Sequence, residues 1–368
     1  MKTVLTVFGT RPELLKLAPV ISALESRDSL RSVVVCTGQH DDLLRPFRQG
    51  LGVRVDEDLA VMQAGQTPAE VCARVLLALP PILERVDPDL VLVQGDTIST
   101  LAGAQAAFLS GRRVGHIEAG LRTREVDEPF PEEGARRMIT RIATWHFAAT
   151  EGNRRTLLGE GAPPERVFVC GNPGVDGLLR ALSCLPPPSP ELAGLLDRPR
   201  LVLLTTHRRE SFGAPMLEHL RALRAFVEAH PEVTLAFPVH PNPRVREAAR
   251  ACLGGHPRIE LLPPLGYADF LWLMRAAWLL VSDSGGVQEE APTLGKPVIV
   301  LRAVTERPEV LACGVGRMAW GGAALTRVLE QAIADPSWAA QAASVANPFG
   351  DGLSGPRIVD RVVELLGR

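Results

Sequence analysis

Residues 3–38 read TVLTVFGTRPELLKLAPVISALESRDSLRSVVVCTG, and this stretch decides the fold. Two short apolar runs, TVLTVFG at 3–9 and RSVVVCTG at 31–38, enclose LLKLAPVISALES at 14–26, whose apolar residues recur at helical spacing. Near-continuous apolar strands that alternate with helices are typical of a parallel sheet covered on both faces. The stretch therefore predicts a strand–helix–strand unit of an α/β protein.

The same alternation continues along the chain and then begins again. Further strand candidates of the first half are LVLVQGD (90–96), RRVGHIE (112–118), WHFAAT (145–150) and RVFVCGN (166–172). After the proline-rich connection ALSCLPPPSPELAGLLDRPR (181–200) come RLVLLTTH (200–207), VTLAFPVH (233–240), RIELLPP (258–264), WLLVSD (278–283) and KPVIVL (296–301). We therefore predict two doubly wound, Rossmann-like α/β domains that face each other across a cleft.

Composition narrows the class of protein. With 368 residues, 46% of them hydrophobic and 22% charged, the chain can form two domains with sizeable cores. The formal net charge of −2 gives no electrostatic footprint for nucleic acid. The start shows no signal-peptide pattern and no apolar run reaches membrane length, so we expect a cytoplasmic protein with no membrane partner.

The spacing of the cysteines and histidines predicts neither disulfides nor a metal site. The six cysteines are scattered without a CxxC motif, so we expect buried thiols in a reducing compartment. The eight histidines show no HxxxH or HExxH spacing, and we expect no metal site.

Several strand candidates end on polar or small residues. These endings are FGTR, QGD, HIEAG, TTHRRE, PVH and SDSGG. In open parallel sheets ligands bind beyond the carboxyl ends of the strands. Six such endings from two domains indicate a cleft lined for chemistry rather than a set of ordinary turns.

Two strand-to-helix turns have the features of anion sites. In VSDSGGVQEEAPTLGKPVIVL (281–301), Ser284, Gly285 and Gly286 lie between a strand and a helix start, where bare N–H groups can face a diphosphate. Glu290 lies one turn inside that helix and could accept hydrogen bonds from ribose hydroxyls; a plain helix cap is the alternative. In FGTRPELLK (8–16), Arg11 and Lys16 add positive charge to a second helix start, and Lys16 is one of only three lysines.

The stretch HIEAGLRTREVDEPFPEEGARR at 116–137 carries six carboxylates and four arginines. An exposed, salt-bridged loop is the simple interpretation, but Glu118 closes a buried strand and caps no evident helix. Asp96 also ends an apolar strand, although Asp96 or Thr97 could cap the next helix. His207 precedes two arginines at a strand end, which favours an anion and proton-transfer site, and His240 is a weaker case.

Taken in order, FGTRPE–LK, QGDT, HIEAGLRT, PFPEE–R, THRRE-SFG, PVHPNP, SDSGG-QEEAP-LGKPV and TERPE resemble the non-hydrolysing UDP-N-acetylglucosamine 2-epimerases, from residue 1 to about 357. The resemblance implies a GT-B-like fold, a homodimer, and interconversion of UDP-GlcNAc and UDP-ManNAc without a nicotinamide cofactor. It also implies that the last helix returns to the first domain. The expected domains are then 1–170 with 355–368, and 171–354.

The resemblance also implies roles for residues. The catalytic set falls on Asp96, Glu118, Glu132 and His207. The implied UDP and substrate contacts are Arg11, Lys16, Arg208, Phe270, Ser284, Gly285, Gly286, Glu290 and Arg307.

This sequence departs from the family pattern at several positions. Ala135 stands where the family has an asparagine. The segment GQHDDLL at 38–44 puts Asp41 and Asp42 where relatives have basic and amide groups, and Gly65 lies where relatives can carry an arginine. Gln39 and His240 are in place for a second, activating UDP-GlcNAc site, which we expect these changes to weaken.

Three other functions fit parts of the pattern. A hydrolysing epimerase would release free ManNAc and UDP from the same motifs. A UDP-sugar glycosyltransferase would share the fold but would leave the carboxylate cluster less explained. A nucleotide-sugar sensor would need the phosphate turn but not Asp96, Glu118 and Glu132.

Overall fold

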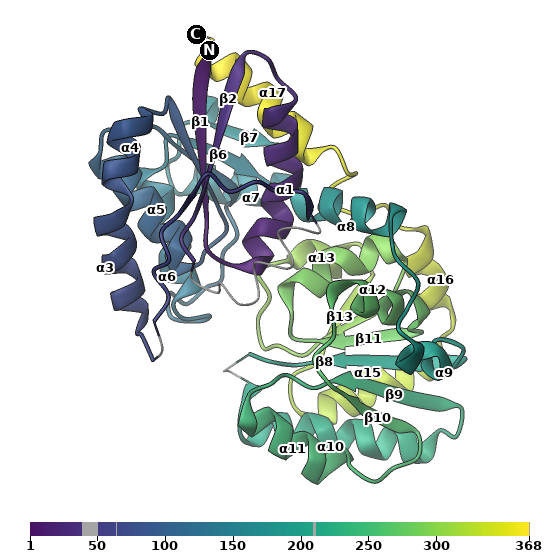
Figure 1. Cartoon of the computed structure of the whole chain (residues 1–368). Coiled ribbons are helices and arrows are strands. Elements are labelled where there is room, and N and C mark those ends of the chain that lie inside the picture. The colour runs from purple at the N-terminus through teal and green to yellow at the C-terminus, as the bar shows by residue number, and fades with distance from the viewer. Residues whose placement is uncertain (39–50, 64, 209–210, 368) are drawn as a thin grey trace. The chain divides into compact units, whose positions relative to one another are not determined.

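A computed structural model of the chain describes residues 1–38, 51–63, 65–208 and 211–367. It contains two compact units (Figure 1). Unit 1 comprises Met1–Leu179 and Phe349–Arg368, and unit 2 comprises Arg180–Pro348.

Unit 1 is built on a seven-stranded sheet in the order β3-β2-β1-β4-β5-β6-β7, in which every pair is parallel. Its strands are β1 (Lys2–Phe8), β2 (Leu30–Cys36), β3 (Glu57–Asp58), β4 (Leu90–Gln94), β5 (Val114–Ala119), β6 (Trp145–Ala148) and β7 (Val167–Val169). Its helices are α1 (Arg11–Glu25), α3 (Pro68–Ala78), α4 (Pro80–Val86), α5 (Ile98–Leu109), α6 (Glu132–Ile142), α7 (Glu151–Gly159), the 3-10 turn Pro164–Arg166 and α17 (Ser354–Leu366). Helix α8 (Pro173–Ser183) leads from unit 1 into unit 2.

Unit 2 has a six-stranded parallel sheet in the order β10-β9-β8-β11-β12-β13. Its strands are β8 (Arg200–Thr205), β9 (Val233–Pro238), β10 (Ile259–Leu262), β11 (Leu279–Ser282), β12 (Val298–Val300) and β13 (Gly316–Met318). Its helices are the 3-10 turn Pro190–Leu192, α9 (Ala193–Leu196), α10 (Ala214–Ala229), α11 (Pro243–Leu253), α12 (Tyr267–Ala276), α13 (Gly285–Leu294), α14 (Pro308–Ala312), α15 (Gly322–Ala334) and α16 (Ser337–Ser344).

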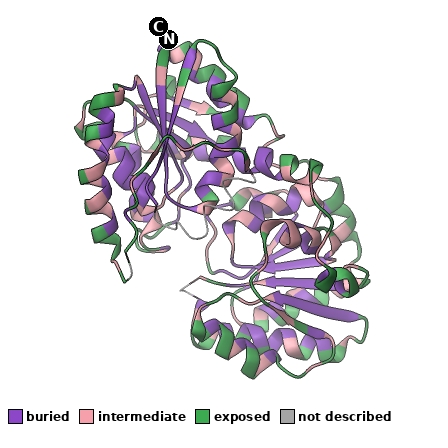
Figure 2. Cartoon of the chain, in the orientation of Figure 1, coloured by how far each residue is buried: buried purple, intermediate pink, exposed green. Residues whose placement is uncertain are grey.

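Most of the strands are apolar because both faces of each sheet are covered, and Figure 2 shows their residues largely buried in both units. In β1, Val4 and Phe8 pack with residues of α1 and α17 on one face, whereas Leu5 and Val7 pack with residues of α3 and α5 on the other. This alternation is the two-residue period of a strand. The predicted α/β class with parallel sheets is therefore confirmed.

All eleven predicted strands are present, and β3 and β13 are two further strands that the sequence did not reveal. Both are short edge strands of two and three residues. Unit 1 includes the chain up to Leu179, and the first turns of α8 are buried. There Asp176 accepts a hydrogen bond of 2.7 Å from the backbone N–H of Gly355, next to the start of α17.

Cysteine burial differs from the prediction in part. Cys36 and Cys170 are buried, but Cys184 is exposed because it follows the end of α8 in the connection between the units. Cys72, Cys252 and Cys313 are partly buried, and no cysteine in the described residues is in a disulfide. Within the same residues, no helix is long and apolar enough to cross a membrane.

The two sheets share one topological feature that positions the candidate site. In each unit the first strand, β1 or β8, lies beside the fourth strand along the chain, β4 or β11, and strand order reverses there. The loops that follow these two neighbouring strands run over the same edge of the sheet. Such switch points are where doubly wound sheets bind ligands.

Candidate functional site

Glu118 is a buried carboxylate at the carboxyl end of β5. Its side chain is 4% exposed and forms an ion pair of 2.5 Å with Lys16 of α1, whose own side chain is 13% exposed. The side-chain amides of Gln94 and Asn172 also donate hydrogen bonds to its carboxylate. A hydrogen-bonded lysine partner makes a buried carboxylate tolerable, because unpaired it would be very costly.

The backbone at Glu118 is strained. Its φ of 64° lies in the left-handed region, which a residue with a side chain rarely adopts. The pairing of β5 with β6 shifts register at this residue, between Ile117 and Ala119. Backbone strain of this kind is concentrated at functional sites, and it costs about 1–3 kcal/mol.

Asp96 follows β4 and belongs to a second network. It accepts a hydrogen bond of 2.8 Å from Nε of Arg136, whose guanidinium also reaches Glu133 at 2.8 Å. Glu133 is fully buried and is bound by Arg137 and the backbone N–H of Thr123 as well. Asp96 is therefore oriented by an arginine that is itself fixed, and Thr97 rather than Asp96 caps α5.

Glu132 begins α6, next to the residues of this network. One of its carboxylate oxygens, Oε2, is buried and has no hydrogen-bond partner in the described residues. Glu132 is thus held differently from Glu133, which donors surround. Ala135, at the departure noted above, is fully buried in the apolar core on that face of the sheet.

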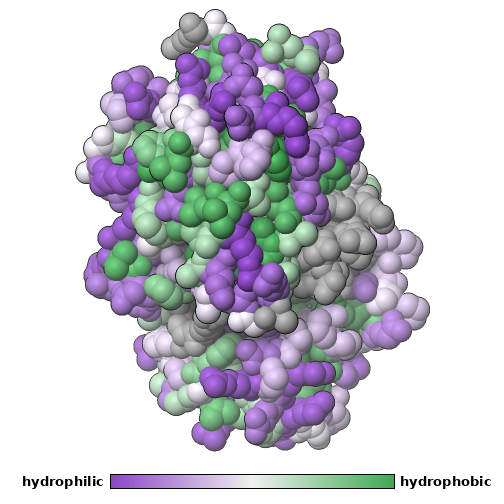
Figure 3. Space-filling model, turned by 60° about the vertical axis from the view of Figure 1, so that its left-hand side comes forward, coloured by the Kyte–Doolittle hydropathy of each residue, from purple (hydrophilic) through white to green (hydrophobic). Residues whose placement is uncertain are grey.

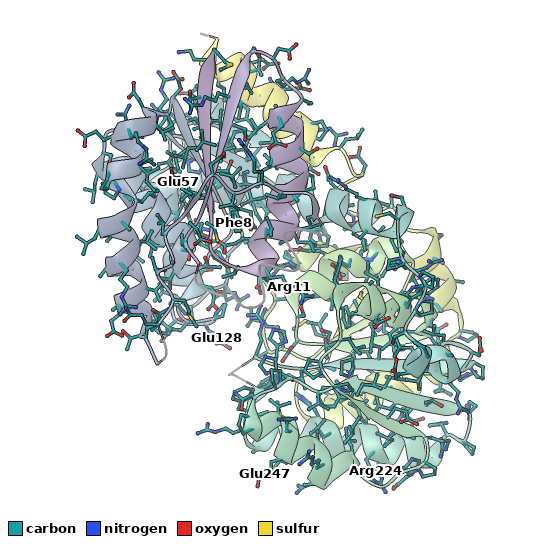
Figure 4. All side chains as sticks on the ribbon, in the orientation of Figure 1. Phe8, Arg11, Glu57, Glu128, Arg224 and Glu247 are labelled. Atoms are coloured by element: carbon teal, nitrogen blue, oxygen red, sulfur yellow. The ribbon has the colours of Figure 1, made fainter. Side chains whose placement is uncertain are left out.

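Arg11 begins α1, and Figure 4 shows it at the end of unit 1 toward which β1 runs, past Phe8. Glu128, in the acidic stretch that precedes α6, lies at the same end. The ends of the strands β1, β4 and β5 and the start of α6 thus gather the unit 1 candidates: Arg11, Lys16, Asp96, Glu118 and Glu132.

Glu13 braces the switch point of unit 1. Its carboxylate accepts hydrogen bonds from the backbone N–H of Gly9 at 3.1 Å and the hydroxyl of Thr10 at 2.6 Å, both in the turn after β1. Its other oxygen lies 3.0 Å from the Thr97 hydroxyl and 2.7 Å from the Thr100 hydroxyl, both after β4. Burial raises the pKa of Glu13, and these hydrogen bonds lower it by less.

His116 lies in β5, two residues before Glu118, and is fully buried. Its Nε2 is 2.8 Å from the carbonyl oxygen of Gly95, the residue before Asp96. Burial lowers the pKa of His116 to about 3, so the ring is neutral near pH 7 and donates to that carbonyl. It acts as a neutral support beneath the Gly95–Asp96 turn.

In unit 2 the centre of the site is Asp283, directly after β11. Its carboxylate accepts hydrogen bonds from the hydroxyl of Thr206 at 2.8 Å and from the backbone N–H groups of His207 and Arg208 at 3.0 Å each. Burial alone would raise the pKa of Asp283, but these hydrogen bonds and His207 outweigh it and lower the pKa to about 2. A carboxylate after one strand thereby fixes the loop after its neighbour, β8.

His207 and Arg208 project from the loop that Asp283 fixes. Nδ1 of His207 lies 3.3 Å from the Asp283 carboxylate, and the ring stacks on His240 with centroids 5.9 Å apart. Arg208 donates from Nε to the carbonyl oxygen of Asp283 at 3.1 Å. Burial, followed by the charge of His207, lowers the pKa of His240. Gln39, Asp41 and Asp42 of the expected second site lie outside the described residues.

Ser284, Gly285 and Gly286 form the start of α13, as the sequence predicted. Ser284 is the N-cap residue, but its side chain makes no capping hydrogen bond. A Cβ on Gly285 would meet the guanidinium of Arg307 at 2.4 Å, so glycine is required for Arg307 to lie against this helix start. Arg307 is oriented by Glu289, which accepts from its Nε at 2.6 Å. The arrangement combines a helix N-terminus with a fixed cation.

Glu290 and Phe270 lie on neighbouring helices of unit 2. Glu290 of α13 accepts a hydrogen bond of 2.9 Å from the hydroxyl of Tyr267, the only tyrosine of the chain. Phe270 lies one turn further along α12 and is half-buried. The hydrogen bond between Tyr267 and Glu290 joins α12 to α13.

Several residues that hold the candidates were missed in the sequence. They are Gln94 and Asn172 at Glu118, Arg136 and Glu133 at Asp96, and Asp283 at His207. Asp283 had a usable signal, because it closes an apolar strand just as Glu118 does. Glu133 had none, because two adjacent glutamates cannot be told apart without knowing which one faces the core.

Known proteins resemble this chain over nearly its whole length. The family model described as UDP-N-acetylglucosamine 2-epimerase matches residues 22–363. A probable UDP-N-acetylglucosamine 2-epimerase of Ralstonia solanacearum is 43% identical, with 97% of this chain and 98% of the relative covered. The UDP-N-acetylglucosamine 2-epimerase of Escherichia coli strain K12 is 41% identical, with 97% of each covered.

Solved structures give the same result. The Staphylococcus aureus MnaA–UDP co-structure has a TM-score of 0.93 and 36% identity, with 100% of this chain and 97% of that chain covered. The UDP-GlcNAc 2-epimerase of Neisseria meningitidis bound to UDP-GlcNAc also has a TM-score of 0.93 and 36% identity, with 98% and 100% covered. The predicted GT-B-like class is therefore confirmed by its structural neighbours.

Proposed function

This chain belongs to the UDP-N-acetylglucosamine 2-epimerase family and is an epimerase, and we propose that it interconverts UDP-GlcNAc and UDP-ManNAc reversibly, without releasing free sugar and without a nicotinamide cofactor. The observation that carries the proposal is the Glu118 site. A buried carboxylate with a lysine at 2.5 Å and two amide donors is held for proton transfer at the end of a strand.

The chemistry requires loss of UDP before C2 can change configuration. The C2 proton of the sugar is not next to a carbonyl, so direct deprotonation is unfavourable. If the bond between C1 and the β-phosphate oxygen breaks, its electron pair leaves with UDP and C1 becomes cationic. A carboxylate then takes the C2 proton, and the C2–H electron pair forms the C1=C2 bond of a glycal.

The return steps reverse this order on the other face. An acid delivers a proton to the opposite face of C2, and the phosphate oxygen of UDP adds to C1. Atoms and charge balance without any redox partner, so no hydride acceptor is needed. We assign the proton transfers and the stabilisation of the C1 cation to Asp96, Glu118 and Glu132. His207 assists the departing diphosphate.

The difference between Glu132 and its neighbour Glu133 supports the choice of Glu132. Glu132 has a buried oxygen without a hydrogen-bond partner in the described residues, whereas Glu133 is enclosed by donors. An oxygen that is desolvated and unengaged can accept a proton from substrate at little cost in lost contacts. Glu133 is the residue that holds Arg136, and it is not expected to reach substrate.

For the nucleotide we propose the residues of unit 2. The start of α13 with Ser284, Gly285 and Gly286, together with Arg307, binds the diphosphate. Glu290 accepts from ribose hydroxyls, and Phe270 contacts the base. Arg11, Lys16 and Arg208 complete the charge that a UDP-sugar requires.

Assembly and location follow from the same proposal. Leu77 of α3 and Leu109 of α5 are 78% and 76% exposed, and Figure 3 shows apolar surface on the face of unit 1 that carries these helices. We propose that this face contributes to a homodimer and that the protein acts in the cytoplasm. Sedimentation equilibrium should give twice the chain mass of 39.7 kDa, and Leu109→Glu should shift it toward the monomer.

The experiment that tests the function is proton NMR of UDP-GlcNAc with the protein in D2O. Deuterium should enter C2 of both UDP-GlcNAc and UDP-ManNAc with no nicotinamide added. Epimerisation without any solvent isotope at C2 would exclude the elimination route. Accumulation of free ManNAc would instead assign the chain to the hydrolysing enzymes.

A further inference from the structure

The carboxylate of Asp283 accepts several hydrogen bonds from the loop after β8. Besides Thr206 and the backbone N–H groups of His207 and Arg208, the hydroxyl of Ser211 lies 3.3 Å from its Oδ2. Four donors thus converge on this oxygen. Oδ1 faces the imidazole of His207 at 3.3 Å, and the whole carboxylate is inaccessible to solvent.

Because Oδ2 accepts from the loop donors and Oδ1 faces the imidazole ring, the tautomer of His207 is determined. An imidazole nitrogen that carried a lone pair toward an anionic carboxylate would be repelled, so Nδ1 must carry the proton and donate to Oδ1. Nε2 is then directed away from Asp283. The carboxylate stays ionised because its pKa is lowered to about 2, despite burial.

We propose that Asp283 is a positioning residue for the reaction, which holds His207 in the Nδ1–H form with Nε2 directed to the diphosphate. When Nε2 is protonated, it donates that proton or a hydrogen bond to the leaving phosphate oxygen. The adjacent Asp283 stabilises the imidazolium. The effect on turnover rests on the proposed epimerase function, but the tautomer itself does not.

Other charged groups around the ring do not replace this role. His240 stacks on the ring rather than meeting it edge-on, with an interplanar angle of 24°. The Arg208 guanidinium is held by the carbonyl oxygen of Asp283 and, at 3.4 Å, by Glu306. Among the groups that the structure describes near His207, Asp283 is the carboxylate that meets a ring nitrogen.

Asp283→Asn gives a specific expectation. The side-chain carbonyl oxygen of the introduced asparagine should take the Oδ2 position, because four donors converge there, and its amide NH2 group must then face His207. Nδ1 becomes an acceptor and the ring changes to the Nε2–H tautomer. Because asparagine and aspartate have nearly the same size, the packing is nearly unchanged. The variant therefore tests the effect of the tautomer without a change in side-chain shape.

The readout is a long-range 1H–15N spectrum of protein labelled with 15N-histidine, above the pH at which the ring is charged. His207→Asn identifies the His207 signals by their loss. In the wild type we expect the Nδ1–H pattern, and in Asp283→Asn the Nε2–H pattern. An Nε2–H pattern in the wild type overturns the proposal without any variant, and this reading holds even if C2 exchange fails.

Turnover tests the consequence. Asp283→Asn should lose about 100-fold in kcat, as removal of a proton-transfer group does. The double variant with His207→Asn should lose no more than about threefold beyond His207→Asn alone, because the two residues act as one unit. If the loss of kcat in the double variant equalled the product of the two single losses, Asp283 would act independently of His207 and its role would be structural. Asp335→Asn, the same change at a partly exposed aspartate just before α16, is the matched control and should keep wild-type turnover.

Discussion

Glu13 in unit 1 and Asp283 in unit 2 do the same structural task with different donors. Each is a buried carboxylate that ties together the loops after the two neighbouring strands at a switch point, β1 with β4 and β8 with β11. Glu13 is bound mainly by threonine hydroxyls, and its pKa is raised by burial. Asp283 is bound by two backbone N–H groups and a histidine as well, and its pKa is lowered to about 2.

The difference shows that burial alone does not decide the charge of a carboxylate. Burial raises the pKa at both sites, and only at Asp283 do the donors outweigh it. In unit 1 the pKa of Glu13 is raised, next to the carboxylates that we propose for proton transfer. Unit 2 keeps a fixed anion beside a histidine and an arginine that we propose to meet a diphosphate.

The largest effect, on the free energy of unfolding, should follow removal of the Asp283 carboxylate. Asp283→Ala leaves His207, Thr206 and two N–H groups without their buried partner, and should lower the free energy of unfolding by about 3–5 kcal/mol at pH 7. Glu13→Ala should cost about 1–3 kcal/mol, because uncharged donors lose less. Urea unfolding followed by circular dichroism compares the two. A larger loss in Glu13→Ala would reverse the comparison.

Next comes the proposed proton-transfer chemistry of unit 1. Glu118→Gln and Asp96→Asn should each lose on the order of 100-fold or more in kcat, about 2.7 kcal/mol or more in the barrier. The rate of UDP-ManNAc formation, followed by NMR, gives kcat for each variant. Glu84→Gln, an exposed glutamate of α4, serves as the control and should be unchanged. A loss below about threefold in Glu118→Gln would remove Glu118 from the chemistry.

A smaller effect is expected for the nucleotide contacts of unit 2. Ser284→Ala and Glu290→Ala should each weaken UDP binding by about 1–3 kcal/mol, since each loses hydrogen bonds to a charged or polyol group. Calorimetry with UDP gives the change directly. Ser344→Ala and Glu247→Ala are exposed controls, and Glu247 lies on α11 (Figure 4). Unchanged affinity in both site variants would place UDP elsewhere.

The smallest effect is a pH slope at Glu13. Its pKa is raised in the folded state, so the unfolded chain loses this proton first and stability falls as pH rises above 4.5. Glu13→Gln cannot titrate, so its stability relative to the wild type should increase as pH rises from 4.5 toward 7. Asp283 has the opposite sign, and its contribution is lost as pH falls from 3.8 to about 2. Thermal unfolding across pH tests both slopes.

Most of the fold could be predicted because each strand carries its own signal. Both faces of the sheets are covered, so the runs around Val4 and Val91 are nearly continuously apolar. The edge strands β3 and β13 lacked that signal, since they are two and three residues long and Asp58 in β3 is exposed.

The site could be predicted only as far as strand endings reveal it. Glu118 and Asp96 stood out because an acid after an apolar strand is unusual. The partners of these acids did not, since Arg136 and Asn172 reach them from segments 40 and 54 residues away. Whether a carboxylate is charged depends on such donors, so no local pattern could distinguish Glu13 from Asp283.

The central claim is that the carboxylates of unit 1 carry out the proton transfers and that the start of α13 in unit 2 binds UDP. Calorimetric titration of Glu118→Gln with UDP tests it most directly, because this variant alters the proposed chemistry and leaves the start of α13 intact. We expect a dissociation constant within about threefold of the wild type, about 0.7 kcal/mol, despite the loss of turnover. A loss of UDP affinity of tenfold or more would contradict the account, because Glu118 would then be a nucleotide contact or a structural support.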